Sequence, residues 1–459
     1  MRRWQHVFRR WFNLSLTKLG TTRIIALMFL FIILTGTVLL MTPWATRDGL
    51  GCGFTPALFT ATSATCVTGL VMYDTWTQFS FFGQVVILCL IQVGGLGFMS
   101  AASVFVFLLR GKVSMKQRLL MAQALSVDDF SGVIRMQKIV LQGSFLIEGI
   151  GAVILFFRFL PEYGALRAAW WGVFHSVSAF CNAGFDIFGY ETPGMSLIPF
   201  NSDPVVCLTL GSLVVVGGLG FFVWEELGRK KKFKTLSVYS KLVLIITVSL
   251  LAAGTAGILL TERNNPATLG SMSGGDKLLN AFFQSVTVRT AGFAAVDQAA
   301  LTDSGKIVSV LLMLIGGSSG STAGGMKTVT LMVMILFVWA RARGRETVSV
   351  FKRTIPNSQI LDAMTITVIM AGLAVFGGLL ISAGSGFSFV DGLYEAASAI
   401  ATVGLSAAGS TNLNLVCKYL IIIYMYFGRV GILTISLGFL GADRVRERFR
   451  YAETKLLIG

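Results

Sequence analysis

Charged side chains are scarce in this sequence. Asp, Glu, Lys and Arg make up 13% of its 459 residues, whereas hydrophobic residues make up 54%. A soluble domain carries about a quarter charged residues, so the composition excludes an ordinary soluble protein. Apolar stretches near the ~20 residues that cross a bilayer recur at 24–40, 139–155, 242–260 and 364–381. The sequence therefore predicts an all-α polytopic membrane protein.

Metal-binding side chains are also few. The only histidines are His6 and His175, which argues against a histidine-based metal centre. The six cysteines, at 52, 66, 89, 181, 207 and 417, show none of the short spacings of zinc or redox motifs. We interpret them as small packing residues. No Walker motif and no Gly-x-Gly-x-x-Gly after a strand-like run is present, so we expect no organic cofactor in this chain.

Acidic residues are outnumbered, and the net charge is +16. Such a charge can indicate nucleic acid, but most Lys and Arg collect in short clusters at 2–23, 110–138, 229–241, 341–353 and 444–455. Clusters of this kind mark the cytoplasmic loops of membrane proteins. Five cytoplasmic clusters require four excursions across the bilayer, which predicts eight crossings with both termini cytoplasmic. The lipid bilayer thus explains the charge, and we expect no nucleic-acid partner.

A short segment between apolar runs occurs four times with one pattern. Each copy begins with an aromatic residue, contains Ser or Thr among small residues and ends in small-x-Gly. The copies are FTATSATCVTGL from Phe59, FHSVSAFCNAGF from Phe174, FQSVTVRTAGF from Phe283 and YEAASAIATVGL from Tyr394. A second glycine landmark follows each on the next apolar run, at 94–97, 217–220, 316–320 and 428–431. Repeats of such a period indicate one structural unit used several times.

We predict that the unit consists of a crossing helix, a short pore helix, a glycine turn and a second crossing helix. We divide the chain into repeats at 23–110, 111–228, 229–345 and 346–443. A basic N-terminal segment, 1–22, and a C-terminal segment, 444–459, flank them, and we expect both to be cytoplasmic.

The glycine turns predict an ion pore. Non-helical backbone at membrane depth persists only where protein or water satisfies its polar groups. Four turns around a pseudo-fourfold axis can aim carbonyls at one ion, as rings of carbonyls replace the water shell of potassium. The alternative is that these glycines serve helix packing. The predicted filter residues are Val67, Thr68, Gly69, Asn182, Ala183, Gly184, Thr290, Ala291, Gly292, Thr402, Val403 and Gly404.

The predicted filter is short. Thr402-Val403-Gly404 resembles the start of the TVGYG potassium-channel filter, but no copy carries the second glycine. We therefore expect weaker selectivity than in such a channel. Asp74, Asp186 and Asp297 follow three of the filter glycines towards the outside. Either they focus cations at the mouth or they are solvated loop charges, and both interpretations stay open.

The second crossing of the third repeat is interrupted by small residues. The run is Gly316, Gly317, Ser318, Ser319, Gly320, Ser321, Thr322, Ala323, Gly324 and Gly325. Glycine costs ~1 kcal/mol relative to alanine inside a helix, so we expect this stretch to be non-helical. It approaches a P-loop, but the spacing fails by one residue. Gly317 to Gly320 also fits an intramembrane serine protease, whose base would have to be His175. Plain helix packing is a further alternative.

Arg429 occupies the place that a glycine takes in the other three repeats. A cation in mid-membrane usually faces a bundle interior or an aqueous cavity. We predict that Arg429 forms an electrostatic and steric barrier below the filter. The alternative is an ion pair with a buried carboxylate, Glu148 or Glu395. Lys327 either stabilises a closed arrangement of 316–325 or extends towards the cytoplasmic interface.

Five motifs carry a family resemblance: CVTGL at 66–70, NAGF at 182–185, RTAGF at 289–293, TVGLS at 402–406 and FGRVGILT at 427–434. With them the chain resembles the Trk/Ktr/HKT superfamily of cation transporters, and it is most similar to the membrane subunit of bacterial Ktr systems. The resemblance covers nearly the whole chain. It implies potassium uptake across the bacterial plasma membrane, with 316–325, Lys327 and Arg429 as the gate.

The resemblance also implies partners, namely a second copy in a homodimer and a ring of cytoplasmic nucleotide-binding regulatory subunits. A sodium-conducting or sodium-coupled relative is the main alternative. Some sodium-conducting plant relatives have serine where this chain has Gly69, which favours potassium. An intramembrane protease is the enzyme alternative. A pump subunit is a third alternative, but the sequence contains no phosphorylation motif. We expect a transporter and no enzyme.

Overall fold

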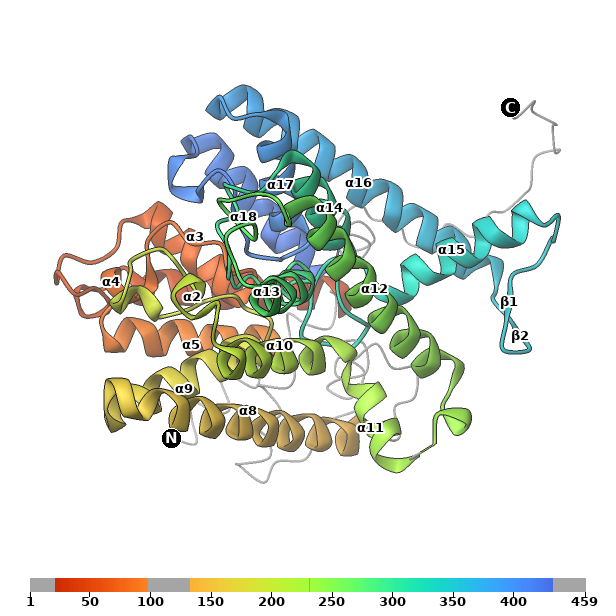
Figure 1. The fold of residues 1–459 in the computed structure, drawn as a ribbon, viewed down its shortest axis with the longest axis horizontal. Helices are drawn as coiled ribbons and strands as arrows, with labels where there is room; N and C mark the ends of the chain where they lie inside the picture. Colours follow the sequence, from red (N-terminus) through yellow and green to blue (C-terminus); the bar gives the residue numbers. More distant parts are fainter. Residues whose placement is uncertain (1–20, 98–132, 231, 432–459) are drawn as a thin grey trace, which may run out of the picture.

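The computed structural model describes residues 21–97, 133–230 and 232–431. Nearly all of the segment 1–22, the repeat boundary at 110–111 and the whole segment 444–459 lie outside these residues. The described chain is mostly helical, as predicted (Figure 1). One small departure from the all-α prediction is an antiparallel hairpin of two-residue strands, β1 (Ser349–Val350) and β2 (Arg353–Thr354).

The described helices differ in length. The long ones are α2 (Thr21–Leu40), α8 (Val133–Tyr163), α12 (Val238–Glu262) and α16 (Asn357–Ser385). A short helix follows each of them: α3 (Phe54–Thr65), α9 (Ala165–Phe180), α13 (Gly274–Thr287) and α17 (Phe389–Ile400). The others are α4 (Thr75–Gln78), α5 (Phe81–Leu96), α10 (Pro204–Leu219), α11 (Phe221–Arg229), α14 (Asp303–Leu314), α15 (Thr328–Ala342) and α18 (Leu415–Val430). Single 3-10 turns lie at Pro43–Ala45, Phe188–Tyr190, Ile198–Phe200, Phe233–Thr235 and Ser410–Asn412.

The four long helices are long and apolar enough to cross a membrane. They expose large apolar side chains, including Phe31, Leu146, Val248 and Val368. A wide exposed apolar surface of this kind marks contact with lipid. In Figure 1, α8 and α16 lie at opposite edges of the molecule. The chain is therefore a multi-pass membrane protein.

The second glycine landmark ends helices. Helices α10 and α11 meet at an angle of 93°, and Gly220 between them has φ 92°. L side chains rarely adopt this conformation, so glycine is needed at the bend. Gly97 and Gly431 end α5 and α18 with similar φ values of 81° and 94°. The bent pair raises the candidate spans among the described residues from four to at most five, so eight crossings stays a prediction.

The helices pack in a closed order. Each long helix contacts the short helix that follows it, in the pairs α2–α3, α8–α9, α12–α13 and α16–α17. The next helix along the chain then contacts the short helix of the following set, in the pairs α5–α9, α10–α13 and α14–α17. Helix α18 completes the cycle by contacting α3. The short helices are therefore brought together around one centre.

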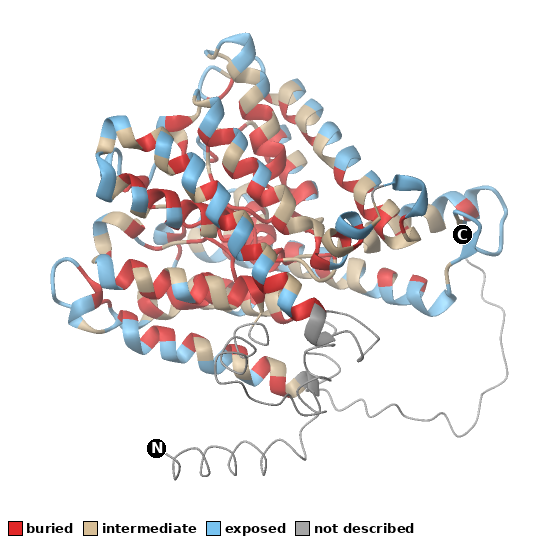
Figure 2. Ribbon diagram, turned by 90° about the horizontal axis from the view of Figure 1, so that it is seen from below, coloured by how far each residue is buried: buried red, intermediate tan, exposed pale blue. Residues whose placement is uncertain are grey.

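Burial follows this arrangement. Buried residues concentrate towards the middle of the molecule, and exposed residues lie along its outer helices and loops (Figure 2). The C-terminal halves of the short helices are buried almost completely, including polar residues such as Thr62, Ser178 and Ser398. All six cysteines are free, and five of them are buried, as expected of packing residues, whereas Cys89 is exposed.

Candidate functional site

The predicted filter triplets begin two or three positions after the last residue of the short helices and share one backbone conformation. Their first residues have positive φ values of 56°, 58°, 69° and 54° at Val67, Asn182, Thr290 and Thr402. The glycines that end the triplets have positive φ values of 96°, 68°, 84° and 101° at Gly69, Gly184, Gly292 and Gly404. The middle residue of each triplet does not have a positive φ value. Alternating handedness directs successive N–H groups to one side of the chain, which leaves the carbonyls on the other side.

The filter glycines approach one another in a closed order. A Cβ atom added to Gly69 would lie 2.6 Å from the carbonyl oxygen of Ala183. Cβ atoms on Gly184 and Gly292 would lie 2.7 Å and 2.6 Å from the carbonyl oxygens of Ala291 and Val403. On Gly404, the Cβ would collide with the carbonyl of Thr68, which returns the order to the first triplet. The structure thus brings together all four triplets that the sequence predicted.

Hydroxyl residues in the short helices hold these triplets, and the sequence analysis did not assign them to the site. The middle N–H of each triplet donates to a backbone carbonyl of the same helix at 2.8–2.9 Å. The acceptors are Ser63, Ser178, Thr287 and Ser398. In three copies this residue stands six positions before the glycine, and in the third copy it stands five before. That spacing is the signal that could have found it.

The hydroxyl groups of these residues act in two ways. Ser63 and Ser398 accept from the N–H of Gly69 and Gly404 at 3.0 Å and 3.1 Å. The hydroxyls of Ser178 and Thr287 instead donate to the carbonyls of Phe185 and Phe293, just after the glycine, at 2.6 Å and 2.8 Å. Both arrangements fix the filter backbone to its own helix.

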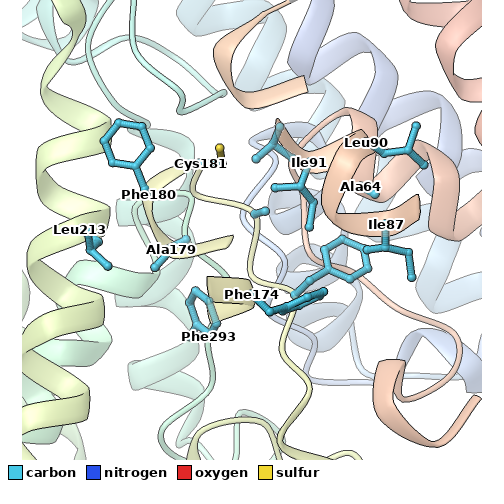
Figure 3. Close-up of a cluster of buried hydrophobic side chains, with 14 of the residues drawn as sticks. Ala64, Ile87, Leu90, Ile91, Phe174, Ala179, Phe180, Cys181, Leu213 and Phe293 are labelled. Carbon is cyan, nitrogen blue, oxygen red and sulfur yellow. The ribbon is translucent and has the colours of Figure 1, made fainter. Parts of the chain in front are cut away.

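Apolar packing supports the second triplet from behind. Phe174, Ala179 and Phe180 of α9 lie near Leu213 of α10, and Ile87, Leu90 and Ile91 of α5 lie on the other side (Figure 3). All belong to one hydrophobic cluster. Close packing of this kind leaves the triplet little room to move.

A cavity of about 300 Å³ adjoins the triplets, and all four filter glycines line it. We call it the outer cavity, because the loops that follow the filter glycines are expected to lie outside the cell. Asp74 and Asp186 also line it, whereas Asp297 does not. The carboxylate of Asp74 accepts from the N–H groups of Thr77 and Gly194 at 2.8 Å and 3.1 Å, so it has a structural role in the loop. Burial raises the pKa of Asp186 to about 6.

The glycine-rich stretch 316–325 contacts the first residues of two triplets, whereas the cavity is lined by the glycines that end them. It is non-helical, which confirms the expected interruption: α14 ends at Leu314 and α15 begins at Thr328. The hydroxyl of Thr322 donates to the carbonyl of Phe180 at 3.1 Å and to Asn182 Oδ1 at 3.2 Å. A Cβ on Gly324 would collide with Thr402. The stretch therefore touches the second and fourth triplets.

Arg429 joins this stretch to the first repeat. Its guanidinium donates to the carbonyls of Thr322 and Gly94, and to that of Gly95 at 3.0 Å. The Lys327 ammonium donates to the carbonyl of Ala323 at 2.8 Å, within the same stretch. Both cations thus bind a carbonyl of the stretch, and Arg429 also binds carbonyls at the end of α5.

The alternative partners of Arg429 are engaged elsewhere. Glu148 accepts from Gln92 Nε2 at 3.0 Å and 3.1 Å, and Glu395 accepts from Ser406 and Ala408. Among the described residues, neither carboxylate forms a salt bridge with Arg429.

The arrangement does not fit a serine protease. His175 Nδ1 bonds the carbonyl of Trp171 at 2.7 Å, and Nε2 accepts from the N–H of Ile187 at 3.1 Å. The hydroxyl of Ser318 bonds that of Thr328 at 3.0 Å. No serine of the stretch has a histidine base within hydrogen-bond reach in the described structure, as such catalysis requires.

Comparison with known proteins also indicates a transporter. The sequence pattern of the TrkH family, described as "Cation transport protein", matches residues 20–445. The chain belongs to the TrkH family. As a member of this cation transport family it is a transporter and not an enzyme.

Relatives match the TrkH-family chain over nearly its whole length. "Potassium/sodium uptake protein NtpJ" of Enterococcus hirae is 37% identical, covering 96% of this chain and 98% of the relative. "Ktr system potassium uptake protein B" of Vibrio alginolyticus is 38% identical, covering 96% and 95%. The crystal structure of the potassium transporter TrkH from Vibrio parahaemolyticus shares the fold, with TM-score 0.70, 18% identity and coverage of 92% and 85%.

Proposed function

We propose that this protein takes up potassium across the bacterial plasma membrane through a carbonyl-lined filter. The observation that carries the proposal is that all four filter glycines line one cavity. Their neighbouring triplets also follow one another in a closed order. Such a ring can replace the hydration shell of one monovalent cation.

The pore is formed by four repeats around a pseudo-fourfold axis, and the chain crosses the membrane eight times. The cyclic contacts of α3, α9, α13 and α17 with the neighbouring sets support this architecture. Both termini lie in the cytoplasm. Arg229 at the end of α11, and Lys230, Lys232 and Lys234 between α11 and α12, support that orientation.

Potassium is the preferred ion because the Ktr relative is named for potassium uptake and because the first triplet ends in glycine. Sodium is the alternative, since NtpJ is named for both ions. The transported ion is held by backbone carbonyls of Val67–Gly69, Asn182–Gly184, Thr290–Gly292 and Thr402–Gly404.

The stretch 316–325 is the gate, and Arg429 and Lys327 hold it closed. The bonds of Arg429 to Thr322 and Gly94 support this role, because they join the stretch to a different repeat. Opening would require these bonds and those of Thr322 to break. A homodimer and cytoplasmic nucleotide-binding subunits complete the transporter, as the resemblance to Ktr systems implies.

Uptake of rubidium-86 into liposomes that contain the purified chain tests the proposal. Uptake driven by internal potassium but not by internal sodium is the expected result. Equal uptake with either ion would favour the sodium alternative. If no uptake occurs, adding the regulatory subunits of a Ktr system should restore it, and failure there would refute the pore.

A further inference from the structure

One position of the short helices carries a different polar residue in each repeat. It follows the leading aromatic residue, and it holds Thr60, His175, Gln284 and Glu395. The last three are at most 1% exposed. Buried polar groups are nearly always hydrogen-bonded, so the partners of these three side chains indicate what the position does.

His175 and Gln284 both bind the chain that leaves the filter of their own repeat. His175 Nε2 accepts from the N–H of Ile187 at 3.1 Å. Gln284 Nε2 donates to Gln298 Oε1 at 2.7 Å, and Gln298 Nε2 donates back to Gln284 Oε1 at 3.2 Å. Gln298 also lines the outer cavity. In each case, the C-terminal half of the short helix is tied to the segment beyond the glycine.

Glu395 makes the corresponding tie in the fourth repeat. Its Oε1 accepts from Ser406 Oγ at 2.5 Å and from the N–H of Ala408 at 2.9 Å. Ser406 follows Gly404 by two residues and lines the outer cavity. The second oxygen, Oε2, is buried without a hydrogen-bond partner in the described part of the chain. The tie therefore uses a single acceptor oxygen.

We propose that Glu395 is a positioning residue that sets ion selectivity at the fourth triplet. By holding Ser406 and Ala408 against α17, it keeps the carbonyls of Thr402–Gly404 from closing around an ion smaller than potassium. Hydrogen bonds are stronger in a low-dielectric interior than in water, so a buried brace of this kind resists such movement. The inference deepens the potassium-pore proposal and rests on it.

The test measures how strongly sodium and potassium compete with rubidium-86 uptake by the full chain in liposomes. Glu395→Ala removes both accepted hydrogen bonds, and we expect the discrimination between potassium and sodium to fall about tenfold while uptake continues. Glu395→Gln keeps an oxygen that can accept both bonds and places its amide nitrogen where Oε2 has no partner. We expect Glu395→Gln to retain most of the discrimination. An equal loss in both variants would overturn the brace, because charge rather than hydrogen bonding would then decide selectivity.

Glu262 provides a matched control. It is also fully buried, and its Oε1 accepts from the N–H and hydroxyl of Thr302 at 3.0 Å and 2.6 Å. It ends α12 and does not line the outer cavity. Glu262→Ala should lower thermal stability and leave discrimination unchanged. If it reduced discrimination as much as Glu395→Ala, general loosening would explain both results and the proposal would fail.

Ser406→Ala keeps the proposal testable if Glu395→Ala does not fold. It removes the 2.5 Å donor to Glu395 and the acceptor of the Gly409 N–H at 2.9 Å, but leaves the bond from Ala408 in place. We therefore expect a drop of a few-fold in discrimination, on the order of one hydrogen bond to a charged group. Unchanged discrimination in Ser406→Ala, measured beside a selective wild type, would refute the brace. A wild type that does not discriminate would refute the potassium pore itself, and the brace with it.

Discussion

The outer and inner halves of the candidate pore are built on different rules. On the outer side, all four triplets share positive φ at their first residue and at their glycine, and each is held by a hydroxyl residue of its short helix. On the inner side, Gly97, Gly220 and Gly431 end helices, but the third landmark becomes the stretch 316–325 and the fourth also carries Arg429. Coordination of one ion needs equal contributions from four sides, whereas a gate needs one part that moves and one that holds it.

The largest expected effect comes from changing one of the four triplets that share a backbone conformation. Gly404 has φ 101°, and a Cβ there would collide with the carbonyl of Thr68. Gly404→Ala should lower rubidium uptake at least about 100-fold, because left-handed strain adds to that collision. Gly149→Ala is the control, since Gly149 lies in α8 with nothing within 4 Å of an added Cβ. Wild-type uptake in Gly404→Ala would contradict the ring.

The next effect concerns the inner half. Arg429→Ala removes the bonds to Thr322, Gly94 and Gly95 together with a positive charge on the proposed ion path. Uptake should rise about tenfold, which corresponds to a barrier lowered by ~1.4 kcal/mol. Arg345→Ala, at an exposed site, should leave uptake unchanged. A fall or no change in Arg429→Ala would mean that the arginine is not a barrier.

A smaller effect should follow when the stretch 316–325 is loosened without changing charge. Thr322→Val keeps the shape of the side chain but removes its bonds to Phe180 and Asn182. We expect a leak of rubidium a few-fold above wild type, as one or two hydrogen bonds are lost. Thr365→Val is the control, because Thr365 is exposed on α16 and bonds only its own helix in the described structure. An unaltered leak would separate Thr322 from gating.

The smallest expected effect comes from removing the serine hydroxyls that hold the fourth and the second triplet in different ways. Ser398→Ala removes a 3.1 Å bond to the N–H of Gly404, whereas Ser178→Ala removes a bond to a carbonyl beyond its glycine. Loss of the first leaves a filter N–H unpaired, so we expect about a threefold loss of discrimination. Ser178→Ala should have less effect. Competition by sodium against rubidium uptake measures both, and the reverse order would show that the second triplet is the more sensitive one.

Much of the site could be predicted because its signals are local. The triplets begin seven or eight residues after an aromatic residue. Each ends in a glycine, where φ is positive and an added Cβ would meet the neighbouring triplet. The break at 316–325 follows from its run of glycines. Other features could not be predicted this way. The sequence offered Glu148 and Glu395 as partners for Arg429, but the arginine binds carbonyls, one of them 335 positions away in the chain.

The sequence by itself determined that the protein lies in a membrane, that an apolar run occupies each of the four long helices α2, α8, α12 and α16, and where the backbone turns out of the helix. Hydrophobicity over ~20 residues and the conformational freedom of glycine are properties of short segments, so they can be recognised locally. Only the tertiary structure decided that Gly69, Gly184, Gly292 and Gly404 face one cavity, that Arg429 binds Thr322 and Gly94, and that Glu395 holds Ser406. These contacts depend on how separate helices pack, and packing is decided by shape and hydrogen bonding over the whole chain.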